Sequence, residues 1–95
     1  MTHLETILEE LEAVLERERS ALTRLHIPTI ESTSREKLAL YERLRSSDEK
    51  PTTELAPRLE RIRSRTIENQ VLLVHARETA RGLAELVRGS LSATG

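Results

Sequence analysis

The chain has 95 residues, one aromatic side chain and no cysteine, and a third of its residues are charged. Its 15 basic and 16 acidic residues are interspersed, so the chain lacks the clustered basic surface typical of nucleic-acid binding. The lack of cysteine excludes a disulfide framework and a thiolate metal site. No signal-peptide pattern stands at the start and no apolar run can span a bilayer, so we expect one soluble cytosolic domain, residues 1–95.

The first segment predicts a helix over about residues 2–26. Apolar residues recur there at intervals of three and four, which is the spacing of an amphipathic helix with one buried face. These residues are Leu4, Ile7, Leu8, Leu11, Val14, Leu15, Ala21, Leu22 and Leu25. Thr2 and Glu5 have the spacing of a capping box, in which a hydroxyl and a carboxylate satisfy free backbone amides.

Glu18 lies within this apolar face. One interpretation is a carboxylate at a frayed or curved part of the helix, which reaches water or a neighbouring arginine. The other is a specificity residue, or a partner for a buried polar group on another helix. We favour the first interpretation on the sequence alone.

The second segment predicts a helix over about residues 28–45. Pro28 disfavours helical geometry in the residue before it and suits the first turn of a new helix. The inward positions are Ile30, Thr33, Lys37, Leu40, Tyr41 and Leu44. Lys37 can lay its methylenes on the core with its ammonium in water, and Glu18 is its candidate partner if the two helices run antiparallel.

The third segment predicts a helix over about residues 54–91, and we expect the other helices to be organised around it. Its inward positions are Leu55, Leu59, Ile62, Thr66, Asn69, Leu73, Ala76, Ala80, Leu83 and Val87. The loop before it, residues 46–53, has no apolar residue; Thr52 or Thr53 is the expected cap, and Pro57 falls in the first turn. Asn69 needs a buried partner, and such an amide often fixes helix register.

The helix lengths predict an all-α fold: an antiparallel three-helix bundle or coiled coil with a long C-terminal helix. Short connections make successive helices antiparallel neighbours. The first helix covers roughly 35 Å of the third, which leaves about fourteen residues, from near Glu78 onward, without a mate in the chain. The apolar face nevertheless continues there, so we expect a partner helix, or a second copy, to cover it. Residues 92–95 are expected to be a flexible tail.

No catalytic, cofactor or metal pattern is found. His3, His26 and His75 are far apart and have no metal-ligand spacing, and there is no glycine-rich phosphate loop. We therefore expect neither an enzyme nor a protein with a cofactor. The remaining classes are a binding module and a self-associating scaffold.

Several residues resemble the FlgN-type flagellar export chaperones. The first segment is similar to that family's Leu-x-x-x-Leu-x-x-Glu-x-x-Ala-Leu run, and the third segment holds its Asn-x-x-Leu-Leu motif. Lys37 follows eleven residues after His26, as in the family, except that the family usually has Asp at the position of His26. The matching residues are Leu11, Leu15, Glu18, Ala21, Leu22, Lys37, Leu40, Leu44, Asn69, Leu72 and Leu73. The family's aromatic residue near the tail, implicated in docking to the export gate, has no counterpart after Tyr41.

The resemblance implies a cytosolic type III (flagellar) export chaperone. Such a protein binds amphipathic terminal helices of hook-associated proteins, prevents their premature assembly and helps deliver them to the export apparatus. It implies a polar seam of Glu18, Lys37 and Asn69. The implied partner-binding residues are Leu72, Leu73, Ala76, Ala80, Leu83, Leu86, Val87 and Leu91. The alternative is a coiled-coil scaffold or adaptor without an export role, in which the same residues form the core of a homodimer.

Overall fold

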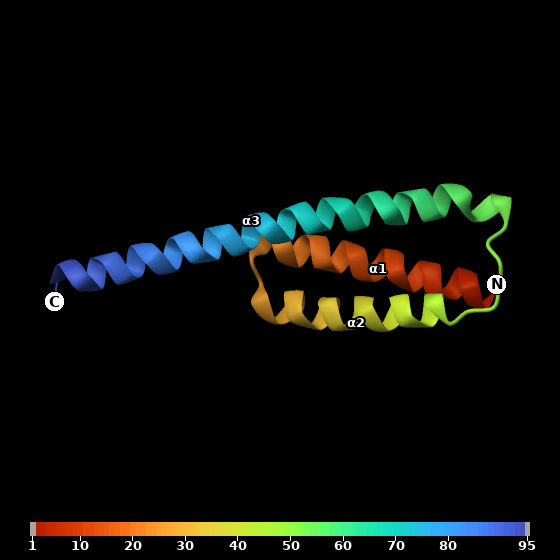
Figure 1. Ribbon diagram of the computed structural model, residues 1–95, viewed down its shortest axis with the longest axis horizontal. Helices are drawn as coiled ribbons and strands as arrows, with labels where there is room; N and C mark the ends of the chain where they lie inside the picture. The colour runs from red at the N-terminus through yellow and green to blue at the C-terminus, as the bar shows by residue number, and fades with distance from the viewer. Residues whose placement is uncertain (1, 95) are drawn as a thin grey trace.

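The structure, a computed structural model, describes residues 2–94 and their side chains as far as residue 91. It contains α1 (His3–Arg24), α2 (Ile27–Arg45), a 3-10 turn η1 (Thr53–Leu55) and α3 (Ala56–Thr94). The helices form a bundle that α3 outreaches at one end, and the molecule measures 63 × 20 × 17 Å (Figure 1). This confirms the predicted all-α bundle with a long C-terminal helix.

Both ends of α1 have local causes. The hydroxyl of Thr2 accepts a hydrogen bond of 3.1 Å from the amide of Glu5, which is the hydroxyl half of the predicted capping box. At the other end Leu25 is left-handed, with φ of 55°, and the amide of His26 donates to the carbonyl of Ala21 at 2.9 Å. This is the Schellman arrangement, and it ends the helix at Arg24, before the expected residue 26.

The second helix begins at Ile27, one residue before the expected start, and Pro28 lies in its first turn as predicted. It returns antiparallel to α1 and ends at Arg45. The loop that follows lies against the start of α1, because Glu49 accepts a hydrogen bond of 3.4 Å from the amide of Leu4. A carboxylate is favourable there, at the positive end of the helix dipole.

The third helix begins later and ends later than expected. The 3-10 turn occupies residues 53–55, no side chain caps it at Thr52, and Pro57 lies in the first turn of α3. The backbone is helical to Thr94, so the expected tail at residues 92–94 is part of the helix. Gly95, the last residue of that tail, lies outside the described residues.

The core is organised around α1. The sequence pattern had predicted that the third helix would hold this place. Most of the buried side chains belong to α1, which lies between α2 and α3 (Figure 1). One side of α1 packs with Ile62 of α3, and another packs with Leu40 of α2. Leu44 of α2 packs against both groups. The greater length of α3 does not make it the centre of the core, because about half of its described residues extend beyond α1 and α2 (Figure 1).

Candidate helix-binding site

A buried polar seam joins all three helices at the end of the bundle from which α3 emerges. Glu18 of α1 is only 4% exposed, and its Oε2 accepts a hydrogen bond of 2.8 Å from Nζ of Lys37 in α2. Its Oε1 accepts one of 2.9 Å from Nδ2 of Asn69 in α3. The favoured interpretation of Glu18 was therefore wrong: it reaches neither water nor an arginine.

The same contacts confirm Glu18 as the predicted partner of Lys37. The Lys37 side chain is 15% exposed, and its ammonium pairs with a buried carboxylate, whereas the sequence pattern predicted it in water. Asn69 is 2% exposed and also donates to the backbone carbonyl of Leu15 at 2.9 Å, whereas its Oδ1 has no partner among the described residues. These contacts can form at only one register of the three helices, so the seam fixes where α3 leaves the bundle.

Beyond the seam, α3 loses its cover. Ala76, 8% exposed, is its last buried side chain among the described residues, and α1 and α2 stop at this level (Figure 1). We call residues 77–94 the overhang. Its four large apolar side chains are more than half exposed: Leu83 55%, Leu86 70%, Val87 59% and Leu91 66%. The overhang begins where the helix lengths predict it.

A groove leads from the bundle onto the overhang. Ile27 and Ile30 of α2 form one wall, and Leu73, Ala76 and Ala80 of α3 form the other. Glu18 also lines the groove, along with the polar and charged residues Glu31, Ser34, Arg35 and Arg77, and the volume is about 440 Å³. The groove lies between α2 and α3 at the end of the bundle from which α3 emerges.

Sequence reasoning found the α3 wall of this groove and missed the α2 wall. Of the predicted partner-binding residues, Leu73, Ala76 and Ala80 line the groove, whereas Leu72 is half-buried outside it. Ile27, 52% exposed, was overlooked because it stands outside the expected helix, directly before Pro28. The signal for it was present, since a proline is common in the first turn of a helix.

The charged residues of the overhang are also distributed unevenly around the helix. With 3.6 residues per turn, Arg77, Arg81 and Arg88 fall along one edge of its apolar face. Glu78 and Glu85 fall on the opposite side of the helix from that face. A ligand helix on the apolar face therefore meets a basic edge.

A second apolar set on α3 was not recognised in the sequence. Ile67, Val71 and Val74 are 50%, 51% and 43% exposed, and they follow the i, i+4, i+7 spacing of one helix face. Asn69 and Ala76, which face α1, lie on the opposite side of the same turns. These three residues are called the outer patch.

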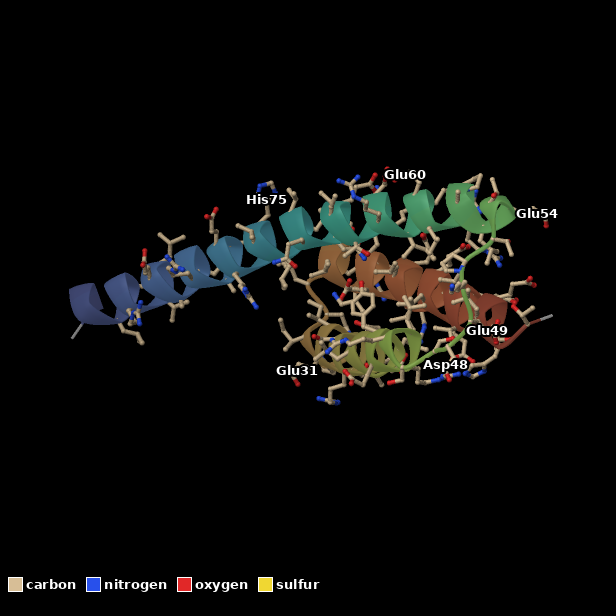
Figure 2. All side chains as sticks on the ribbon, turned by 45° about the vertical axis from the view of Figure 1, so that its right-hand side comes forward. Glu31, Asp48, Glu49, Glu54, Glu60 and His75 are labelled. Carbon is tan, nitrogen blue, oxygen red and sulfur yellow. The ribbon has the colours of Figure 1, made fainter. Side chains whose placement is uncertain are left out.

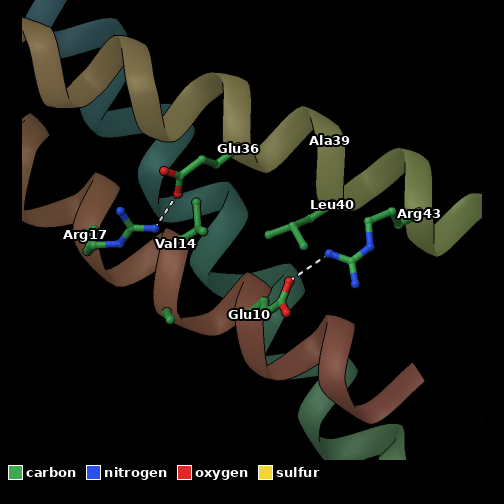
Figure 3. A pocket seen from close by; sticks show the side chains of 8 residues that line it. Glu10, Val14, Arg17, Glu36, Ala39, Leu40 and Arg43 are labelled. Carbon is green, nitrogen blue, oxygen red and sulfur yellow. Dashed lines mark hydrogen bonds and ion pairs between the residues drawn. The ribbon is translucent and has the colours of Figure 1, made fainter. Parts of the chain in front are cut away.

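The groove between α1 and α2 is a weaker candidate. Val14 and Leu40 line it, and ion pairs of Arg17 with Glu36 and of Arg43 with Glu10 bridge its two sides (Figure 3). The four charged side chains are about half exposed, so these pairs add little stability. A ligand helix in this groove would have to displace both ion pairs.

Other classes of site find no support in the part of the chain that the structure describes. No three residues among His, Asp and Glu come together as metal ligands there, and His75 points away from the bundle (Figure 2). None of the described helices has the length and apolar character needed to cross a membrane. Comparisons with protein-family models, curated proteins and solved structures find no significant match to this chain.

Proposed function

We propose that the protein is a cytosolic export chaperone that binds an amphipathic helix of a partner protein on the overhang of α3. The observation that carries the proposal is the exposed apolar face from Ala80 to Leu91, which continues a groove of the bundle. The resemblance to the FlgN-type chaperones suggests the partner: a terminal helix of a hook-associated protein, shielded until export. The proposed role is binding, without catalysis or a cofactor.

The geometry suggests how the partner helix lies. The first part of α3 packs on α1, whereas α1 ends before the overhang, where Leu83 and Val87 are exposed (Figure 1). A partner helix placed there lies end to end with α1 and covers Leu83 and Val87. Covering such half-exposed aliphatic side chains contributes on the order of 1 kcal/mol each.

A second copy of the chain fits this face less well. A parallel copy needs the space that α1 occupies, because its own α3 must run back along the bundle. An antiparallel copy brings like edges together, so that Arg81 of one chain is level with Arg88 of the other. That repulsion favours a different protein, with acidic residues on the edge that meets the arginines.

The test is a titration with a labelled peptide of a hook-associated protein's terminal helix, followed by fluorescence anisotropy and circular dichroism. We expect the peptide to bind and to gain helix, and the double variant Leu83→Asp, Val87→Asp to lose binding. Leu38→Asp is the matched control, because Leu38 is equally exposed, at 64%, but lies on α2. A peptide of the same composition with its apolar spacing scrambled should not bind.

The scaffold alternative predicts a different result. There, light scattering finds a tight dimer that Leu83→Asp and Val87→Asp together dissociate, and the peptide binds neither form. That outcome would remove the chaperone proposal and leave the self-associating adaptor.

A further inference from the structure

The outer patch on α3 has no role in the bundle or in the proposed helix-binding face. Ile67, Val71 and Val74 point away from α1 and are each about half exposed. All three are β-branched, which helix propensity alone does not favour at a solvated surface. Their presence at one face of a solvated helix therefore points to a contact.

Charged residues frame the outer patch in a repeated order. Glu60 and Arg63 precede it and pair with each other at 3.3 Å; Glu78 and Arg81 follow it, and neither has an ion pair among the described residues. Glu60 points away from α1, like the patch (Figure 2). Along this face the order is acid, base, three aliphatic residues, acid, base.

We propose that the outer patch binds a second copy of this chain, with the two α3 helices antiparallel. Let Gln70 of one copy lie beside Val71 of the other. Ile67 is then level with Val74 of the second copy, Arg63 with its Glu78, and Glu60 with its Arg81. The contact is two-fold symmetric, so each pairing occurs twice. The order of acidic and basic residues on one copy thus matches that on the second copy only when the two α3 helices run in opposite directions.

A parallel pair is disfavoured by the same residues. In register, it places Glu60 beside Glu60 and Arg63 beside Arg63, and like charges at an interface oppose association. The order of charges therefore favours another copy of this chain as the partner, and it favours the antiparallel orientation of the two α3 helices. The contact area is small, so the association should be weak and dependent on salt.

The two binding faces lie on opposite sides of α3, and Arg81 stands at the border between them. The outer patch lies on the opposite side of α3 from Asn69 and Ala76, so both copies keep α1 and α2 on the outside of the pair. The apolar face of each overhang stays open to a partner helix. This inference is therefore independent of the proposed function, and either can fail alone.

A charge-reversal pair tests the inference. Arg63→Glu places glutamates level with each other at both ends of the contact, and Glu78→Arg places arginines there. We expect each variant alone to associate at least about tenfold more weakly than the wild type. Mixed in equal amounts, the two variants restore both charge pairs. The mixture should therefore form heterodimers about as tightly as the wild type self-associates.

Sedimentation equilibrium over a wide concentration range gives the association constants, and circular dichroism checks that the helix content is unchanged. Val71→Asp should abolish association, whereas Val87→Asp, on the opposite side of α3, should leave it intact. A wild-type chain that stays monomeric at high concentration would overturn the inference. So would a mixture that associates no better than its separate components.

Discussion

The carboxylate of Glu18 in α1 accepts a hydrogen bond of 2.9 Å from the side-chain amide of Asn69 in α3, and these residues are 4% and 2% exposed. The other oxygen of Glu18 binds the ammonium of Lys37 in α2. In the described residues, the backbones of α2 and α3 do not pack against each other. One buried carboxylate therefore connects α2 and α3, whose side chains also meet at the 3.2 Å hydrogen bond between the hydroxyls of Tyr41 and Thr66.

The first prediction concerns the energy of this seam. Glu18→Leu leaves the buried ammonium of Lys37 without an acceptor and leaves the amide of Asn69 with only the carbonyl of Leu15, so it should lower the free energy of unfolding by about 3 kcal/mol. The triple variant Glu18→Leu, Lys37→Met, Asn69→Leu removes every polar group of the seam and should recover most of that loss. Urea denaturation measures both. A triple variant as unstable as Glu18→Leu would show that the side-chain shapes, more than the charges, matter here.

The second prediction concerns the end of α1. Leu25 adopts a left-handed conformation, with φ of 55° and ψ of 39°, which costs a residue with a Cβ about 1–2 kcal/mol. Leu25→Gly relieves this strain, but it makes the unfolded chain more flexible by roughly 0.5–1 kcal/mol. We expect a net gain in stability of about 0.5–1 kcal/mol, seen as a higher melting temperature. Leu25→Ala keeps the strain and should give no gain in stability. Equal effects of the two substitutions would contradict the view that the left-handed backbone at Leu25 costs stability.

The helices and their lengths could be read from the sequence because they follow from local rules. The three- and four-residue spacing marks the buried faces, Pro28 and Pro57 mark first turns, and a run without apolar residues marks the loop. The overhang then follows from length alone, since α3 is longer than the helices that can cover it.

The partners of polar residues could not be read in the same way. Whether Glu18 reaches water or a buried amide depends on Asn69, which is distant in sequence and is brought close only by helix packing. The outer patch was missed for a different reason. Ile67, Val71 and Val74 lie on the side of α3 away from its inward face, and single apolar residues at a surface are normal, so the sequence alone does not mark them as a contact.

The third prediction separates stability from binding. A chain that ends after Arg81 loses Leu83, Leu86, Val87 and Leu91, none of which is buried. Its free energy of unfolding should stay within about 0.5 kcal/mol of the full chain, because surface changes of this kind have small effects. It should no longer bind the labelled helical peptide, yet it should still self-associate through the outer patch.

The control for the truncation is a change in the core. Ile62 is 7% exposed and packs with Leu4, Leu8 and Leu15, so Ile62→Ala should cost about 2–4 kcal/mol through lost burial and a cavity. If truncation after Arg81 costs as much as Ile62→Ala, the overhang supports the bundle, and the view that it is free for a partner is wrong.

The last prediction concerns the basic edge of the overhang. Arg77 and Arg88 border the apolar face, so a bound helix with acidic residues on that edge gains from both charges. The double variant Arg77→Glu, Arg88→Glu should bind an acidic-edged peptide about tenfold more weakly at low salt. High salt should reduce the difference in affinity between this variant and the wild type, since exposed charges are screened within about 10 Å at 0.1 M ionic strength. Anisotropy titrations at two salt concentrations measure this.

Arg43→Glu is the matched control, because Arg43 is also exposed but lies beside α1, where it pairs with Glu10. It changes the net charge in the same direction, so a comparable loss of affinity would mean that the peptide senses only the overall charge. An unchanged affinity for Arg43→Glu, with a salt-dependent loss for the overhang variant, instead locates the attraction at the edge of α3. Repeating the titration with a peptide whose acidic edge is replaced by glutamine should then remove the effect of Arg77→Glu and Arg88→Glu altogether.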